Sequence, residues 1–397
     1  MRSPRTCSPP RCRNRRRDRL DRRYVHRVVN DVFGPGLHEL RVLSLANGVT
    51  GVMNAAVLSL HAIGQAYARV AETSAKSGVK QMDRVVGNSG ISVEEAQKRW
   101  APYIVGERRE IVVALDWTDF EKDDHSTLAA YLITSHGRAT PLMWRTVKKS
   151  ALKDRRNEYE YELVERLHDA LPDDVAITLL ADRGFGDQKL YAHLGVLGWD
   201  YVIRFRGVIA VENKAGESRA ADQWVPATGR PLKIAPARVT SDRTEIAAVV
   251  VVHAKAMKEA WCLATSLGDR PASEIVKLYS RRFTIEETFR DQKDIHFGMG
   301  LSATHIKNAD RRDRLMLLAA VAQVLLTLLG AASEASGLDR YLKVNTSKKR
   351  THSLFRQGLY WYECIPTMRE EWLRPLMDAF DRIVREQAFF REVFGVI

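Results

Sequence analysis

Residues Tyr279–Lys293 read YSRRFTIEETFRDQK, and the interpretation of the whole chain starts from this stretch. Apolar residues recur every three to four positions in and just before it, which predicts a helix: Ile275, Leu278, Phe283, Ile285 and Phe289. Residues three, four and seven positions apart share one face of a helix. One stripe of the expected helix therefore carries an aromatic hydroxyl, two cations and one carboxylate, from Tyr279, Arg282, Glu286 and Lys293.

A lone carboxylate among cations suits a site that handles phosphate groups and a metal ion together. The alternative is a solvated helix whose charged side chains form ordinary ion pairs one turn apart. The helix pattern by itself leaves both interpretations open.

The spacing of these residues is Tyr, two residues, Arg, three residues, Glu, six residues, Lys. It resembles the signature of the insertion-sequence-four family of DDE transposases. The wider segment IVKLYSRRFTIEETFRDQKD, residues 275–294, is similar to the Tn-ten type within that family. The resemblance implies that Glu286, and not its neighbour Glu287, is the third catalytic carboxylate. It covers roughly residues 37–365.

The composition is that of a basic globular protein. With 397 residues and 45.0 kDa, the chain is long enough for two or three domains. Lys and Arg number 62 against 49 Asp and Glu, which gives a net charge of +13. This excess favours nucleic acid over a membrane as partner, because basic surfaces gain affinity when condensed counterions are released. A basic protein without such a partner is the alternative that charge alone allows.

The cysteines indicate a reducing compartment. Cys7 and Cys12 lie in an Arg/Pro-rich tail, and Cys262 and Cys364 are isolated among apolar residues, so we expect free thiols and no zinc site. The amino terminus is charged and lacks the apolar core of a signal peptide. We therefore expect a cytoplasmic protein, which the resemblance places in bacteria, in association with the nucleoid when bound to DNA.

One apolar run, Leu315–Gly330, has the composition of a membrane span. It is shorter than a typical span and contains Gln323 and Thr327. We therefore predict a buried core helix and no membrane partner.

Residues 1–36 are rich in Arg and Pro, and we expect them to be disordered because they offer little apolar surface to bury. They form either an arm that holds DNA or an extension produced by an early start codon.

Residues 37–108 show helical periodicity, with a break between two helices near Asn47-Gly48 or Asn54.

A further short helix should end at Gly87-Asn88, and the next should begin at Ser92. The cations Lys76, Lys80 and Arg84 could place this helical module against DNA. The order of its segments looks like the amino-terminal domain with which Tn-ten-type enzymes recognise transposon ends.

Residues 109–206 are predicted to form the first part of the catalytic core. A buried strand ends in Asp116, two extended runs surround the turn His136–Arg138, and a helix over 157–171 follows. Next come a second apolar strand ending in Asp182, a helix and a strand. This is the element order of a ribonuclease-H-like fold, in which the first and fourth strands are neighbours. Asp116 and Asp182 should then lie side by side.

Residues 207–258 read as a β-rich insertion, 259–335 as the second part of the core, and 336–397 as a helical region with a basic loop. The resemblance implies that Trp261 stacks on a base flipped out of the transposon end; the alternative is a buried core tryptophan. It also implies that Arg204, on the strand after Asp182, contacts DNA.

Three converging carboxylates can hold two hard divalent cations, which prefer oxygen ligands. We expect two Mg²⁺ ions, with Mn²⁺ as a substitute, bound by Asp116, Asp182 and Glu286, Asp116 bridging both. Tyr279, Arg282 and Lys293 would hold the phosphates of the transposon end.

The reaction that the resemblance implies is cut-and-paste transposition: strand nicking, hairpin formation and opening, and strand transfer. It needs double-stranded DNA with terminal inverted repeats, target DNA and a homodimer in the synaptic complex. The alternatives are a catalytically silent DNA-binding relative and a ribonuclease-H-like nuclease without strand transfer.

Overall fold

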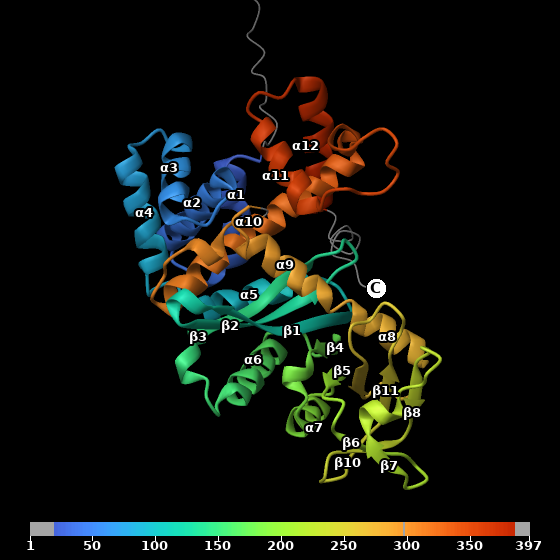
Figure 1. Ribbon diagram of the computed structural model, residues 1–397. Coiled ribbons are helices and arrows are strands. Elements are labelled where there is room, and N and C mark those ends of the chain that lie inside the picture. Colours follow the sequence, from blue (N-terminus) through green and yellow to red (C-terminus); the bar gives the residue numbers. More distant parts are fainter. Residues whose placement is uncertain (1–19, 297, 386–397) are drawn as a thin grey trace, which may run out of the picture.

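An eight-stranded mixed sheet forms the centre of the molecule (Figure 1). The computed structural model describes residues 20–296 and 298–385. The strands lie in the order β3-β2-β1-β4-β5-β12-β11-β8. Their bounds are β1 Glu110–Phe120, β2 His125–Ile133, β3 Ala139–Lys148, β4 Ala176–Ala181, β5 Asp200–Phe205, β8 Leu232–Ile234, β11 Ala248–Val252 and β12 Trp261–Thr265. The β1–β4 and β4–β5 pairs are parallel, and the other neighbours are antiparallel.

The order of elements expected for residues 109–206 is confirmed. Strands β1, β2 and β3 are followed by α6 (Arg156–Ala170), β4, α7 (Gln188–Val196) and β5. Strands β1 and β4 lie side by side, with Leu115 opposite Ala181. This mixed α/β architecture, with helices at both ends of the chain, fits a ribonuclease-H-like fold.

Helices cover both faces of the sheet (Figure 1). α9 (Phe283–Lys293) and α10 (Ala309–Ala335) pack on one face, and α6 and α7 pack on the other. All residues of β2 are buried as a result. Strands covered on both faces can be apolar, which is why the sequence showed apolar runs in β1 and β4.

The sequence predicted that the first strand ends at Asp116. In the structure Asp116 lies within β1 instead. The strand continues to Phe120 because its antiparallel pairing with β2 extends to the pair Phe120–His125. Asp182 directly follows β4, in agreement with the prediction.

Helices precede the sheet, and their bounds are α1 Arg22–Phe33, α2 Glu39–Ala55, α3 Leu60–Val70, α4 Ala75–Gly87 and α5 Val93–Val105. Helix α4 ends at Gly87 with Asn88 as its C-cap, and the Ser92 side chain caps α5 by accepting a hydrogen bond from the N–H of Glu95. Both boundaries were predicted. Helix α2 runs through Gly48, where a Cβ would lie 2.8 Å from Leu318 Cδ1, so this glycine allows α2 to approach α10 closely. The break falls just after Asn54, the second expected position.

The disorder expected up to residue 36 is wrong for residues 20–36. The Asp21 carboxylate caps α1, one face of this helix is buried, and the Tyr24 ring lies 5.5 Å from that of Phe380. Apolar residues recur at helical spacing between the arginines, so the polar average composition concealed an amphipathic helix. Residues 1–19 lie outside the described residues.

Between residues 207 and 258 the chain forms short strands. Four of them make a second sheet in the order β10-β9-β6-β7. Their bounds are β6 Ala210–Glu212, β7 Ser218–Ala220, β9 Ala237–Val239 and β10 Thr244–Ile246. Strands β8 and β11, from the same segment, extend the large sheet beyond β12.

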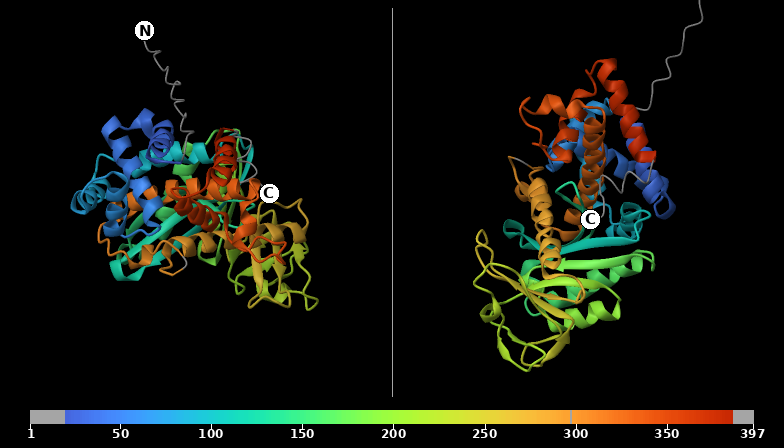
Figure 2. Two further views of the ribbon diagram at one scale, coloured as in Figure 1. Left: turned by 90° about the horizontal axis from the view of Figure 1, so that it is seen from above. Right: turned by 90° about the vertical axis from the view of Figure 1, so that its right-hand side faces the viewer.

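Helix α10 forms the core between the two helical ends of the chain. It contacts α2, α11 (Leu354–Cys364) and α12 (Glu370–Arg385), and Figure 2 shows it between them. Among the described residues, α10 is the only individual helix that is long and apolar enough to cross a membrane. Helices α2 and α3 reach that length and apolarity only when taken together, and the pair is bent by 100°. The apolar window of α10 is 100% buried inside the protein, which confirms the predicted core helix.

Candidate active site

The parallel pairing of β1 with β4 brings Asp116 and Asp182 to neighbouring positions at one edge of the sheet. Local backbone groups orient both carboxylates. Asp116 Oδ1 accepts a hydrogen bond from the N–H of Trp117 at 2.9 Å, and Asp182 Oδ1 accepts one from the N–H of Gly184 at 2.7 Å. These two predicted site residues therefore lie together as expected.

The stretch Tyr279–Lys293 is not the continuous helix that its periodicity predicts. It is shared between α8 (Ala272–Ser280) and α9, and at the junction the N–H of Arg282 bonds to the carbonyl of Tyr279, three residues back. This tighter turn rotates the following residues relative to an uninterrupted α-helix. Arg282 is directed inward and is 5% exposed, whereas Phe283, expected in the core, is 39% exposed.

Arg282 joins the third carboxylate to the first. Its Nη1 lies 3.0 Å from Asp116 Oδ2, and its Nη2 donates to Glu286 Oε1. The guanidinium can bridge two acceptors because its donors form a planar fork. Glu286 is the carboxylate of α9 that faces the sheet edge, while Glu287 pairs with Arg290 and Arg138.

The pKa of Asp116 is raised to about 6, chiefly by burial; Arg282 opposes this rise, and the nearby Asp182 and Glu286 carboxylates contribute to it. The mutual repulsion means that the three carboxylates lie within electrostatic reach of one another. A single guanidinium leaves this cluster with an excess of negative charge. Such a cluster is suited to binding additional cationic charge.

An aromatic group lies beside the carboxylates. The Trp261 ring, at the start of β12, is edge-on to Tyr279 with centroids 5.0 Å apart, and it stacks on Phe283 at 5.8 Å. Tyr279 is buried, and this burial raises its pKa to about 12, so the hydroxyl stays protonated. Trp261 is only partly buried. One side of the ring is thus packed on protein while part of it remains accessible.

Arg204 and Lys293 are held by protein groups. Arg204, on β5, donates from Nη2 to Glu259 Oε2 at 2.7 Å and to the carbonyl of Ala260 at 3.1 Å. Lys293 Nζ lies 3.0 Å from Thr118 Oγ1 and 2.8 Å from the carbonyl of Asp119, both on β1. The structure therefore attaches Lys293 to the same strand that carries Asp116.

A comparison with protein families supplies the remaining observation: residues 107–325 match the model described as the transposase DDE domain. The match covers more than half of the chain and includes all three carboxylates. The chain belongs to the DDE transposase family. It is a DDE-type DNA transposase, an enzyme that binds DNA and cuts it. None of the curated proteins compared with the chain matches it.

DDE transposases generally use divalent metal ions. Within residues 20–296 and 298–385, no three His, Cys, Asp or Glu side chains are close enough together to hold a metal ion as they stand. The donor atoms nevertheless suit a hard divalent cation, because they are carboxylate oxygens in a cluster with excess negative charge. In this arrangement the Arg282 guanidinium takes the place between Asp116 and Glu286.

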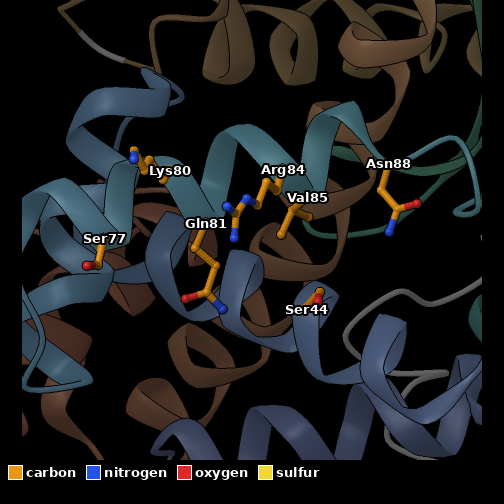
Figure 3. A pocket seen from close by; sticks show the side chains of 7 residues that line it. All are labelled: Ser44, Ser77, Lys80, Gln81, Arg84, Val85 and Asn88. Carbon is orange, nitrogen blue, oxygen red and sulfur yellow. The ribbon is translucent and has the colours of Figure 1, made fainter.

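The transposase also has a polar groove on its helical amino-terminal region, far in sequence from the carboxylates. It encloses about 530 Å³ between α2 and α4 (Figure 3). Lys80 and Arg84 line it on α4, together with polar side chains of both helices: Ser44, Ser77, Gln81 and Asn88. Two of the three cations that the sequence singled out on this helix are therefore at one groove.

Sequence reasoning missed the buried carboxyl of Glu160. It lies on α6, is 2% exposed, and accepts a hydrogen bond from Trp117 Nε1 at 2.8 Å. Burial raises the pKa of Glu160 to about 7. The segment NEYEYELVE contains several glutamates of identical local appearance. Only the tertiary contact with the residue after Asp116 distinguishes this one.

Proposed function

We propose that this transposase moves its element by cut-and-paste transposition and that Asp116, Asp182 and Glu286 are its catalytic carboxylates. The observation that carries the proposal is the pair of contacts from one buried guanidinium, Arg282, to Asp116 and Glu286, beside Asp182. Three segments far apart in the sequence supply these groups. The motif spacing further supports a place in the insertion-sequence-four family, near the Tn-ten type.

The three carboxylates would hold two Mg²⁺ ions, or Mn²⁺ in their place. When bound, the ions would activate the attacking water or 3′ hydroxyl and stabilise the leaving oxygen of an in-line displacement. Asp116 is suited to a position shared by both ions because it is more buried than the other carboxylate on Arg282, with a side chain 15% exposed against 49% for Glu286. Arg282 would then turn from the carboxylates to the DNA phosphate.

The side chains around the carboxylates suit a DNA end. Arg282, Lys293 and the protonated Tyr279 would hold its phosphates, since they supply positive charge and hydrogen-bond donors. The partly accessible Trp261 ring offers a surface for an unstacked base, because base–aromatic stacking tolerates any base. Arg204 on β5 would contact the backbone nearby.

The remaining regions receive roles that follow from this proposal. The helical module 37–108 would bind the terminal repeat, with Lys80 and Arg84 of the α4 groove on the phosphates. The strands of residues 207–258 would form a β-rich insertion within the core, ahead of the third carboxylate. A homodimer would pair two element ends in the synaptic complex, with nicking, hairpin formation, hairpin opening and strand transfer in sequence.

The test is a cleavage assay on a duplex that carries the element's terminal repeats, with Mg²⁺, with Mn²⁺ and with EDTA. We expect metal-dependent nicks at the repeat ends, then hairpins, then products joined to target DNA. Cleavage without joined products would indicate a nuclease that lacks strand transfer. Binding without cleavage in either metal would indicate a catalytically silent relative, and both results contradict the proposal.

A further inference from the structure

Two arginines from different segments converge on one carboxylate oxygen beside the candidate active site. Arg183 directly follows Asp182 at the end of β4, and Arg204 lies on β5. Glu259 lies in the loop before β12. Its Oε2 is 3.0 Å from Arg183 Nη1 and 2.7 Å from Arg204 Nη2.

This cluster has the properties of an exchangeable contact. The Glu259 and Arg183 side chains are each 55% exposed, and exposed ion pairs contribute little to stability. The two guanidinium groups lower the pKa of Glu259, so it is an anion at neutral pH. Both guanidinium groups donate to the same oxygen, Glu259 Oε2, although together they have enough N–H groups for several acceptor oxygens.

Arg204 is fixed independently of Glu259. Its side chain is 18% exposed and also donates to the carbonyl of Ala260. Its buried Nε has no hydrogen-bond partner in the described part of the chain. Loss of Glu259 would therefore leave Arg204 in place with spare donors.

The position of the cluster connects it with DNA. Arg183 adjoins Asp182, Glu259 precedes Trp261 by two residues, and Arg204 is close enough to Tyr279 to lower its pKa against the larger effect of burial. We propose that Arg183 and Arg204 together bind one backbone phosphate of the DNA next to the reacting end, and that Glu259 occupies the place of this phosphate until DNA enters. This inference rests on the proposed function, because it takes the carboxylate edge to be where DNA binds.

A phosphate suits the two guanidinium groups better than Glu259 does, since it offers several oxygens to two planar forks. Binding then exchanges an internal anion for a DNA phosphate. Glu259 should lower the affinity for DNA, and the size of that effect should depend on Arg183.

The test measures binding of full-length protein to a fluorescein-labelled duplex carrying the element's terminal repeat, in EDTA, over a range of NaCl concentrations. Glu259→Gln should tighten binding by roughly five-fold, the factor that one exposed ion pair can supply. Arg183→Gln should weaken binding and reduce the slope of log affinity against log salt by about one, the loss of one phosphate contact. In the double variant the gain from Glu259→Gln should largely disappear.

A matched pair serves as control. Arg155 and Glu158 lie at the start of α6, with side chains 56% and 62% exposed and Nε 2.9 Å from Oε2. Arg155→Gln and Glu158→Gln should leave the salt slope unchanged. All variants should keep the melting temperature of the parent protein within about two degrees, as surface substitutions usually do.

Two results would overturn the proposal. An equal gain from Glu259→Gln with and without Arg183 would mean that Glu259 only repels DNA at a distance. A lower melting temperature and weaker binding in Glu259→Gln would mean that the cluster is structural. Because binding is measured without metal, neither result bears on the catalytic carboxylates, and failure of metal-dependent cleavage would leave the binding result standing.

Discussion

Glu160 illustrates how a residue near the site can carry a cost in stability. Its carboxyl is buried against Trp117, and burial raises its pKa from 4.5 to about 7. The folded protein therefore binds a proton on Glu160 that the unfolded chain releases above pH 4.5. Stability falls as the pH rises through this window and stays low above pH 7, where the buried group must ionise.

Glu160→Gln removes the charge and keeps an oxygen for the Trp117 N–H. We expect the variant to gain about 2 kcal/mol relative to the parent between pH 5 and pH 8, as the shift in pKa requires. Urea unfolding in EDTA at both pH values measures the difference. The neighbour Glu158, whose side chain is 62% exposed, provides the control Glu158→Gln, which should show no such change. Equal differences in the two variants would contradict the assigned pKa.

Arg282 supplies the positive charge that pairs with Asp116 and Glu286 in this structure. Its side chain is 6% exposed and that of Asp116 is 15% exposed, so removal of one partner leaves a buried charge without compensation. Arg282→Ala should lower the free energy of unfolding by about 3 kcal/mol in EDTA. Mg²⁺ should raise the melting temperature of this variant more than that of the parent, because the guanidinium no longer competes for the carboxylates. Equal Mg²⁺ effects would contradict metal binding at this site.

At the scale of elements, helices α10 and α11 cross where each has a glycine. A Cβ on Gly358 would overlap the carbonyl oxygen of Leu326, and one on Gly330 would overlap that of Leu354. Gly358→Ala should therefore cost about 3 kcal/mol or more, because the helices must separate. In contrast, Gly195 in α7 has open space around its Cβ position, and Gly195→Ala should stabilise the protein by a few tenths of a kcal/mol, the helix preference of alanine. Denaturant unfolding compares the two, and similar costs would contradict the crossing.

Local signals predicted the elements well. The Ser92 cap and the end of α4 at Gly87-Asn88 depend on nearby residues, and the structure has them where the sequence indicated; the apolar strands are also present, although β1 continues beyond Asp116. The junction of α8 and α9 was not predictable, because Arg282 follows the helical spacing and only its contact with Asp116, far away in the sequence, turns it inward. The same applies to Glu259, whose partners Arg183 and Arg204 are far away in the sequence.

Some features of the candidate site were predictable from the sequence, and others were not. The resemblance to the transposase signature favoured Glu286 over Glu287, and strand order predicted that Asp116 and Asp182 are neighbours. In the structure Glu286 contacts Arg282, whereas Glu287 pairs with Arg290. The burial of Glu160 and the convergence of Arg183 with Arg204 arise from tertiary packing, which the periodicity of the sequence does not reveal.

At the scale of the whole molecule, one hydrophobic core runs from Leu20 to Ile383. Helix α10 packs against the amino-terminal helices, the sheet and the carboxy-terminal helices. We expect these three regions to unfold in one cooperative transition, because none of the three can separate from α10 without exposing apolar surface. Far-UV circular dichroism and tryptophan fluorescence should give coincident melting curves. Two separated transitions would show that the helical regions are independent of the sheet.

We propose that Asp116, Asp182 and Glu286 act as the catalytic carboxylates of this transposase. The most direct measurement compares Glu286→Gln with Glu287→Gln for Mg²⁺-dependent cleavage of a terminal-repeat duplex, with binding in EDTA as the reference. We predict that Glu286→Gln lowers the cleavage rate by about a thousand-fold or more and leaves binding intact, while Glu287→Gln cuts like the parent. Cleavage at the parental rate by Glu286→Gln, or equal loss in both variants, would contradict a catalytic role for Glu286.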